Sequence, residues 1–376
     1  MKPSQSRRQF FQIGAAALGG VCGVDGASDL PRGIAAVPKS KNVIFGDVRR
    51  IFSSTGKRNY NAFTSMTYWR DRYWVVFTQK TKHIANPPDG RIMLILSEDL
   101  RTWSAPILLP DAIGDDRDAK ILATPDRLVV YNTPYPHETL VCHSRNGRDW
   151  TKPVPAYPAG QQRRGRGTGG AQFWKPKWHA GAYYVACDYT NDRVDLLKSS
   201  DGIQWKYHAT MMSGGKHPRT KHPTETAIVF LQDESCLALT RLNDLEGGNC
   251  IAGFSLARPP YDKWEFTLGE AVRFGGPAVE RFGDTIVVAA RAELGDKPGF
   301  LNLPLDYGWN GMRAVLYTLN LSTMRLELQA VLPSEHRRDN SYFGMVCETE
   351  SSGVISWYDG NTTDKSDIWL ARIGIV

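Results

Sequence analysis

Three stretches of the chain repeat one short pattern in which a serine precedes a tryptophan by six residues. The copies are Ser97–Trp103, Ser144–Trp150 and Ser199–Trp205, and each carries Asp or Asn two residues after the serine. A degenerate fourth copy ends at Trp264, so the tryptophans recur at intervals of 47, 55 and 59 residues. Spacing of this kind indicates a β-propeller, because a four-stranded blade with its loops uses about 40–50 residues or slightly more.

Each copy of the pattern fits a hairpin turn. The Asp or Asn side chain accepts hydrogen bonds from backbone N–H groups, and glycine, where present, adopts a positive φ. The tryptophan packs between neighbouring sheets. We therefore expect Trp103, Trp150 and Trp205 to occupy equivalent places in three successive blades, away from any axial pocket.

With these turns as markers, the chain divides into six units of apolar strands and turns. The units are 61–110, 116–157, 171–212, 225–268, 276–332 and 341–376. The last unit has three evident strands, and Val43–Ile51 can supply the fourth by pairing the two chain ends. We therefore expect an all-β fold, a six-bladed β-propeller of four-stranded antiparallel blades. A five-bladed ring is the alternative, because the fifth unit is long and its loop at 293–311 is irregular.

The first residues are typical of an export signal. Ser6-Arg7-Arg8-Gln9-Phe10-Phe11 precedes a weakly apolar run of small residues, Ile13–Val24. This pattern indicates the twin-arginine export machinery, and the run is too weakly apolar for stable membrane insertion. We expect residues 1–36 to be the signal peptide and 37–376 a single propeller domain that is periplasmic or secreted. The alternatives are a basic tail and lipidation at Cys22.

The formal net charge is +7, and part of the excess is local, in Arg163–Arg166 and His336–Arg338. Such runs suit an anionic glycan better than a nucleic acid, or are simply solvated loops. Five cysteines follow the signal region inside apolar runs without CxxC spacing, which predicts unpaired core residues. The sequence has no metal-ligand spacing, phosphate-cradling glycine loop, Ser-His-Asp elbow or dinucleotide fingerprint, so we expect no cofactor.

Several segments resemble sialidases and related proteins with Asp-box repeats, also called BNR repeats. They are Pro223–Asp233, Ala238–Arg241, Asn340–Met345, Ser356–Tyr358 and Ile368–Ile373. Together with the repeated turns, the likeness spans nearly the whole chain after the signal region. The resemblance implies a pocket in which a Tyr paired with a Glu is the nucleophile, an Asp is the acid/base and three arginines hold the substrate carboxylate.

By position, the resemblance makes Tyr342 the nucleophile and Glu225 its paired carboxylate. It also makes Arg241 and Arg291 two of the three arginines. The first arginine has no clear match, because the first unit begins Asn61-Ala62-Phe63 where a sialidase has Arg-Ile-Pro.

The charged segment Asp116–Lys120 opens the second unit. Strand alternation would place Arg117 and Ala119 on one face, and Asp118 and Lys120 on the other. Inner strand ends of a propeller converge on its axis. We therefore expect one cavity at an end of the channel to be formed by Asp118, Glu225, Arg241, Arg291 and Tyr342. Local ion pairs between blades are the alternative for Arg117 and Asp118.

Further candidates for substrate binding lie outside these motifs. His83 lies in the long loop after the second strand of the first unit and can hydrogen-bond a sugar. Trp174, Trp357 and Tyr358 can stack on a sugar ring. The alternative for the histidine is a bystander role, and for the aromatics it is core packing.

The leading interpretation is an exported glycosidase, exo-sialidase-like, that hydrolyses an acidic or complex glycan. Cleavage of a glycosidic bond needs one carboxylic acid to protonate the leaving oxygen and one anionic group opposite, and Asp118 and Glu225 are candidates. A second interpretation is a non-catalytic carbohydrate-binding propeller. A third is a polysaccharide lyase, with His83 and Tyr342 near a charge-neutralising cation.

Overall fold

The structure is a computed structural model that describes residues 41–110, 114–135, 139–157, 171–188, 193–214, 222–243, 251–272, 274–293, 312–333, 339–362 and 365–376. In these ranges there is no helix, and so none long and apolar enough to cross a membrane. Several predictions fall outside the described residues. They are the signal at 1–36 with Cys22, the basic runs Arg163–Arg166 and His336–Arg338, Cys250, and the loop at 294–311.

The strands follow the short β-branched and aromatic runs of the sequence. In chain order they are β1 (Val43–Phe52), β2 (Tyr60–Trp69), β3 (Arg72–Lys80), β4 (Arg91–Ser97), β5 (Ile107–Leu108), β6 (Asp115–Ala123), β7 (Leu128–Tyr135), β8 (Leu140–Ser144), β9 (Val154–Pro155), β10 (Gln172–Phe173), β11 (Lys177–His179), β12 (Ala182–Asp188), β13 (Arg193–Ser199), β14 (Lys206–Ser213), β15 (His222–Phe230), β16 (Cys236–Asn243), β17 (Ile251–Ala257), β18 (Glu265–Val272), β19 (Gly275–Phe282), β20 (Thr285–Glu293), β21 (Met312–Asn320), β22 (Arg325–Val331), β23 (Asp339–Thr349), β24 (Ser352–Thr362) and β25 (Lys365–Ile375).

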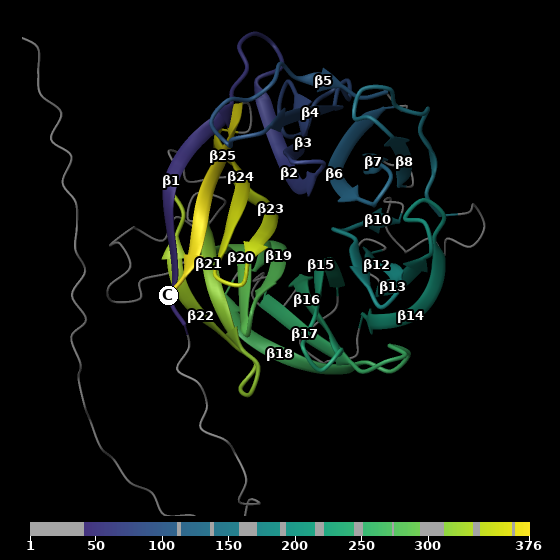
Figure 1. The fold of residues 1–376 in the computed structure, drawn as a ribbon, viewed down its shortest axis with the longest axis vertical. Helices are drawn as coiled ribbons and strands as arrows, with labels where there is room; N and C mark the ends of the chain where they lie inside the picture. The colour runs from purple at the N-terminus through teal and green to yellow at the C-terminus, as the bar shows by residue number, and fades with distance from the viewer. Residues whose placement is uncertain are drawn as a thin grey trace, which may run out of the picture. The chain divides into compact units, whose positions relative to one another are not determined.

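These strands form five hydrogen-bonded sheets that stand in a ring around a central axis (Figure 1). Four sheets are separate blades, ordered β6-β7-β8-β9, β10-β12-β13-β14 with β11 also on β12, β15-β16-β17-β18 and β19-β20-β21-β22. The fifth sheet has eight strands, in which β2-β3-β4-β5 and β23-β24-β25-β1 are two antiparallel runs of four. The predicted all-β propeller fold is confirmed.

The prediction of six separate blades, and its five-bladed alternative, need correction. In the described part of the chain there are four separate blades and one eight-stranded sheet, because Tyr60 of β2 pairs in parallel with Ser366 of β25. The Ser366 amide donates to the Asn59 carbonyl at 3.1 Å, and the Asn61 side chain donates to the Ser366 carbonyl at 2.9 Å. These bonds merge the first and last units of the chain, which repeat spacing does not reveal.

Pairing of the two chain ends closes the ring, as predicted. Strand β1 runs antiparallel to β25, with Val43 opposite Ile375. The Asn42 and Val376 backbones exchange two hydrogen bonds of 2.9 Å. Both Val43 and Ile375 are buried in one apolar cluster, so the closure is an apolar as well as a hydrogen-bonded contact.

The three repeated turns have the same hydrogen bonds. In each, the serine hydroxyl accepts a bond from the amide three residues later at 2.8–2.9 Å. The Asp or Asn Oδ1 accepts bonds from the amides two and three residues later at 2.7–2.9 Å. The residue three after the serine has a positive φ in every copy and is Leu100, Gly147 or Gly202. The predicted turn chemistry is confirmed, including at the copy that lacks glycine.

The tryptophans of these turns are equivalent, as predicted. Trp205 packs into the apolar cluster between its own sheet and that of the preceding unit. Trp150 and Trp103 pack into the corresponding clusters one and two positions earlier in the ring. These side chains therefore stabilise the contacts between neighbouring units.

Loss of one such turn carboxylate should weaken the fold measurably. We expect Asp201→Ala to lower the free energy of unfolding by about 1–2 kcal/mol, because two backbone amides lose their acceptor. Urea denaturation measures this loss. Asp262→Ala, in the exposed segment before β18, is the control and should change stability by less than about 0.5 kcal/mol. Equal effects of the two substitutions would contradict the turn's role.

No disulfide joins any of the cysteines in the described ranges. Cys142, Cys187 and Cys236 are buried, as expected of core residues, and burial raises the pKa of the Cys142 thiol to about 12. Cys347 is exposed, which corrects its prediction as a core residue. Its place near the end of β23, beside the turn to β24, accounts for that exposure.

Candidate functional site

The inner strands of the units share a β-bulge near their starts. The residues skipped in the pairing registers are 63–64 in β2, 118–119 in β6, 224–225 in β15, 276–277 in β19 and 342–343 in β23. In the third unit, the inner strand is instead broken into β10 and β11 around residues 174–176. Bulges re-aim side chains and are common beside active sites. We call these five pairs of residues the bulge ring.

Three residues of the bulge ring have a strained backbone. Phe63, Asp118 and Tyr342 have φ values of 59°, 52° and 50°, in the left-handed region that non-glycine residues rarely adopt. Such conformations cost about 1–3 kcal/mol each and cluster at functional sites. Their repetition around one axis indicates a functional end of the propeller.

Tyr342 and Glu225 form a direct pair across the ring. The Tyr342 hydroxyl donates to Glu225 Oε1 at 2.6 Å, although the two residues are 117 positions apart. The Gly276 amide donates to Glu225 Oε2 at 2.5 Å. The positive φ of Gly276 and its contact with Ser341 leave no room for a side chain there. Backbone and side-chain donors from two strands therefore fix the orientation of the Glu225 carboxylate.

Two arginines flank the Glu225 carboxylate. Arg241 of β16 donates through Nη1 to Glu225 Oε1 at 2.9 Å and through Nε to Asn243 Oδ1 at 2.8 Å. Arg291 of β20 is only 3% exposed, and both its guanidinium and the Glu225 carboxylate lie against Gly275. The predicted convergence of Glu225, Arg241, Arg291 and Tyr342 is therefore present in the structure.

The charges of this cluster set its protonation states. Burial acts to raise the pKa of Glu225, but Arg241, Arg291 and the Tyr342 hydrogen bond offset it, so the net pKa is lowered. Burial raises the pKa of Tyr342 well above its usual value, and the Glu225 and Asp118 charges add to the shift. At neutral pH the pair is a phenol that donates to a carboxylate.

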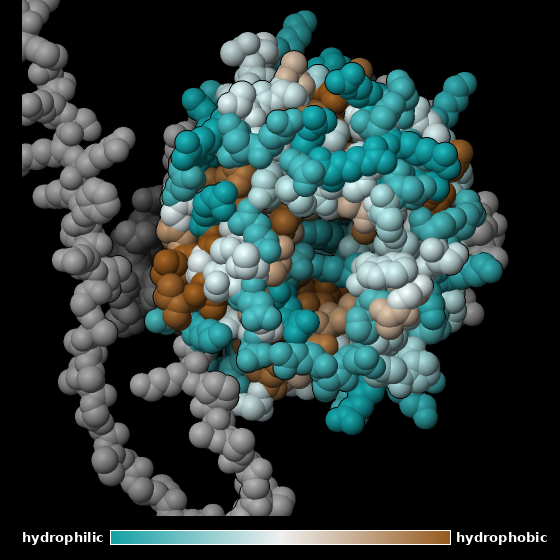
Figure 2. Space-filling view, in the orientation of Figure 1, coloured by the Kyte–Doolittle hydropathy of each residue, from teal (hydrophilic) through white to brown (hydrophobic). Residues whose placement is uncertain are grey.

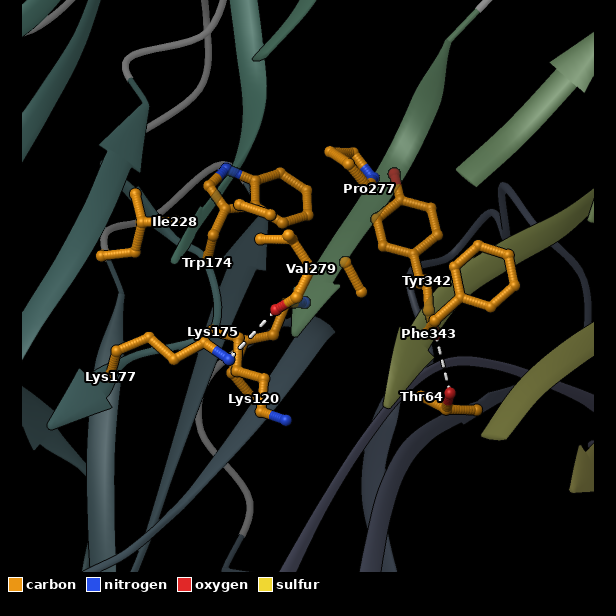
Figure 3. Close-up of a pocket in the computed structure, with 12 residues that line it drawn as sticks. Thr64, Lys120, Trp174, Lys175, Lys177, Ile228, Pro277, Val279, Tyr342 and Phe343 are labelled. Carbon is orange, nitrogen blue, oxygen red and sulfur yellow. Dashed lines mark hydrogen bonds between the residues drawn. The ribbon is translucent and has the colours of Figure 1, made fainter. Parts of the chain in front are cut away.

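Aromatic rings surround the Tyr342 phenol. Trp174 stacks on it with ring centroids 5.8 Å apart and an interplanar angle of 23°. The Trp174 indole donates to Asp188 Oδ2 at 2.7 Å, which fixes the ring. Phe63 contacts Tyr342 edge-on at 5.0 Å, and buried Tyr358 lies 6.2 Å away. Figure 3 shows Trp174 and Tyr342 on two sides of one pocket.

Asp118 and Lys120 approach Tyr342 from β6. The Asp118 carboxylate is close enough to raise the pKa of Tyr342, and its Oδ1 has no hydrogen-bond partner among the described residues. The Lys120 ammonium donates to the Asp118 carbonyl at 2.8 Å. It also lies 4.9 Å from the Trp174 ring centroid and 5.6 Å from that of Tyr342.

Lys120 is a buried cation, which has a consequence for stability. Burial lowers its pKa to about 8, against the attraction of Asp118, Glu225 and Asp188. The pKa of Lys120 is lower in the folded than in the unfolded chain, so its buried charge destabilises the fold. This destabilisation is complete below pH 8 and disappears as the pH rises toward the unfolded pKa. We expect Lys120→Met to raise the free energy of unfolding at pH 7 by about 3 kcal/mol.

Denaturation at several pH values tests this expectation. The gain from Lys120→Met should shrink between pH 8 and about pH 10.5, because only wild type then gains stability by deprotonation of Lys120. Lys198→Met is the matched control, since Lys198 also lies over a ring, that of Tyr184, but is exposed. A Lys120→Met chain that is less stable than wild type at pH 7 would contradict the argument.

His83 and Arg117 lie at the edge of the site. His83 Nδ1 shares a 2.7 Å hydrogen bond with the Tyr60 hydroxyl, and its ring contacts Phe63 at 5.7 Å. Arg117 donates to the His83 carbonyl at 3.0 Å and pairs with Asp115 at 3.5 Å. Both residues contact Phe63, which in turn contacts Tyr342. The ion pair between Arg117 and Asp115 lies within β6 and does not join two blades.

Three predictions for this region need correction. Trp357 is 0% exposed inside an apolar cluster between sheets, so it does not face the pocket. Tyr358 is equally buried and backs Tyr342 instead of presenting a face to a sugar. The alternation predicted for Asp116–Lys120 also fails, because the bulge at 118–119 interrupts it and turns Ala119 into an apolar cluster.

Sequence reasoning assigned no role to Phe63 or Asp188. Phe63 belongs to Asn61-Ala62-Phe63, which stands where sialidases have Arg-Ile-Pro, so the sequence showed only a departure from that motif. Asp188 ends β12 and contacts Trp174 and Thr224 at 2.7 and 3.2 Å. A charged residue at the end of an apolar strand, VACD, was the available signal. In the described part of the chain, no group of three or more His, Cys, Asp or Glu is placed to hold a metal.

The comparisons with known proteins concern the fold. No family model and no curated protein matches the sequence. Among solved structures, a protein of unknown function from Dyadobacter fermentans is similar with a TM-score of 0.70 at 15% identity, over 90% of this chain and 100% of that one. Phage phi92 endosialidase gives 0.61 at 10% identity, over 88% and 69%. Penicillium chrysogenum alpha-L-arabinanase gives 0.61 at 10%, over 87% and 98%.

The fold is a sialidase-like β-propeller. The centre of the ring is hollowed and largely hydrophilic on the face shown in Figure 2. Identities this low carry the architecture alone, so the chemistry rests on the residues of the bulge ring and their neighbours.

Proposed function

We propose that this protein is a glycoside hydrolase of the sialidase-like kind that acts on an acidic or complex glycan. The observation that carries the proposal is the 2.6 Å hydrogen bond between Tyr342 and Glu225, with Arg241 on the same carboxylate oxygen. A phenol has little nucleophilicity while protonated, so it needs an adjacent base in hydrogen-bond contact. Glu225 has the required geometry.

The proposed reaction uses Tyr342, Glu225 and Asp118. The Tyr342 oxygen attacks the anomeric carbon, Glu225 takes the phenol proton, and Asp118 donates a proton to the leaving glycosidic oxygen. Water then attacks the glycosyl-tyrosine, Asp118 takes its proton, and Glu225 returns a proton to Tyr342. The unpartnered Oδ1 of Asp118 is consistent with an oxygen that bonds substrate.

The acidic substrate is proposed from the cations of the site. Arg241 and Arg291 flank Glu225 at the centre of the cluster, and Arg117 lies at its edge. Solved structures similar in fold include an endosialidase, an arabinanase and a sialidase, which supports a glycan substrate. Export through the twin-arginine machinery to the periplasm or the medium is part of the same proposal.

Incubation of the purified chain with sialylated, uronate-containing and neutral glycans tests the proposal. Hydrolysis predicts release of a saturated sugar, which mass spectrometry detects. An unsaturated product would instead indicate the lyase reaction, for which His83 and Tyr342 on either side of Phe63 are the candidates. Binding without any product would indicate a carbohydrate-binding propeller.

A further inference from the structure

A cavity beside the bulge ring carries an unusual set of charges. Its lining includes Thr64, Lys120, Trp174, Lys175, Lys177 and Tyr342, and the described residues that line it include three lysines and no acidic residue (Figure 3). The positive charge of these lysines faces the pocket from β6, from β11 and from the turn before β11. Such a lining favours an anionic group over a neutral or cationic one.

Two of these lysines already have partners. Lys175 donates to Glu280 Oε1 at 3.2 Å and to the Met345 carbonyl at 2.5 Å. Lys177 also binds Glu280, and it donates to the Val279 carbonyl at 3.2 Å. One carboxylate thus compensates two ammonium groups, which leaves this part of the cavity with a surplus positive charge.

Lys120 is the lysine whose ammonium is not satisfied by the protein. It is 5% exposed, and within the described ranges it makes one hydrogen bond, to the Asp118 carbonyl. An ammonium group has three donors, so two N–H groups remain for a ligand. A buried charge without an ion pair is costly, and such a residue is a candidate for binding an opposite charge.

The size of the cavity limits what can bind. Its free volume is about 20 Å³, above the roughly 10–15 Å³ that one water molecule needs, so the cavity admits a small substituent but not a whole sugar ring. The faces of Trp174 and Tyr342 beside it suit the apolar face of a sugar whose substituent enters the cavity.

We propose that this cavity is a subsite for an anionic substituent of the glycan, a carboxylate or a sulfate ester, bound by the Lys120 ammonium with Lys175 and Lys177 behind it. The proposal rests on the proposed function, and it names the group of the substrate that the site recognises. Arg241 serves the Glu225 carboxylate. Lys120 then supplies a cation for the anionic group, where the first of the three arginines implied by the resemblance has no match in this sequence.

Binding at this subsite should depend on pH. Burial lowers the pKa of Lys120 to about 8, and the groups that act on its charge are the carboxylates of Asp118, Glu225 and Asp188. The other titratable groups of the lining are Lys175, Lys177 and Tyr342. Burial also lowers the pKa of Lys175 to about 8, so Lys120 and Lys175 both lose their positive charge as the pH rises above 8.

Calorimetric titration of the full chain with three sugars tests the subsite. The probes are D-glucuronate, D-glucose 6-sulfate and D-glucose, at pH 7 and at pH 9.5. We expect one or both anionic sugars to bind more tightly than glucose, and the comparison between them distinguishes carboxylate from sulfate. Lys120→Met should weaken anionic binding by about 10- to 100-fold, the loss of a charge-assisted hydrogen bond. Wild type should weaken similarly at pH 9.5.

The controls separate this proposal from the catalytic one. Lys198→Met removes an exposed lysine over a ring and should leave binding unchanged. Circular dichroism and thermal melting check that Lys120→Met is folded. Two results would overturn the subsite. One is a Lys120→Met chain that binds the anionic sugars as tightly as wild type does, and the other is a wild-type chain that does not prefer them over glucose. If anionic binding depends on Lys120 but no glycan is cleaved, the hydrolase proposal fails and the subsite stands.

Discussion

Tyr342→Phe should abolish most turnover of any glycan that the wild-type chain cleaves, with kcat lowered by about 10²- to 10⁴-fold. The substitution removes the oxygen that attacks the anomeric carbon and keeps the ring, which packs against Trp174 and Phe63. Glu225→Gln should cause a loss of similar size, because the amide cannot take the phenol proton. KM should change less than kcat, since neither change removes a residue assigned to hold the anionic group.

Tyr73→Phe is the matched control for this experiment. Tyr73 also donates its hydroxyl to a glutamate, Glu348, but it lies at the opposite end of β3 from the site, next to the turn after β2. Its loss should leave kcat unchanged. Steady-state kinetics on the three chains decide the matter, and a Tyr342→Phe chain with wild-type kcat would exclude Tyr342 as nucleophile.

Trp205→Ala should cause the largest loss of stability, about 3–5 kcal/mol. The Trp205 side chain is 1% exposed and contacts Tyr131 and Phe173 edge-on, with ring centroids 6.0 and 5.6 Å apart. Both partners belong to the cluster between the second and third units. Truncation leaves a cavity at that contact, and neighbouring strands can collapse into it only in part.

Trp178→Ala provides the control on the same sheet. Trp178 of β11 is 57% exposed, so its removal should cost less than about 1 kcal/mol. Guanidinium chloride denaturation of the two variants gives the difference. A Trp205→Ala chain as stable as Trp178→Ala would show that the repeated tryptophans do not hold the units together.

The repeat contains enough local information to predict much of the architecture. The turn at Ser144, Asn146 and Gly147 is held by hydrogen bonds between residues only two or three positions apart. The local sequence pattern is therefore enough to predict its geometry. Unit boundaries followed from the same markers, and β1 was paired with β25 because the last unit lacked a strand. The parallel bridge between Tyr60 and Ser366 could not be predicted, since nothing local to either residue encodes it.

The candidate site divides in the same way between sequence and tertiary structure. Motif position alone brought Glu225, Arg241, Arg291 and Tyr342 together, because strand starts and strand exits of a propeller meet at one end of the axis. The bulges at 118–119 and 342–343 were invisible to a strict two-residue alternation, so the side-chain directions near Lys120 were mispredicted. Trp357 has an indole ring of the kind that stacks on sugars, and only the packing of neighbouring sheets shows that it belongs to the core. The hydrogen bonds of the turns depend on residues close together in the sequence. Burial, charge compensation and the joining of two sheets depend on residues that come together only when the chain closes the ring.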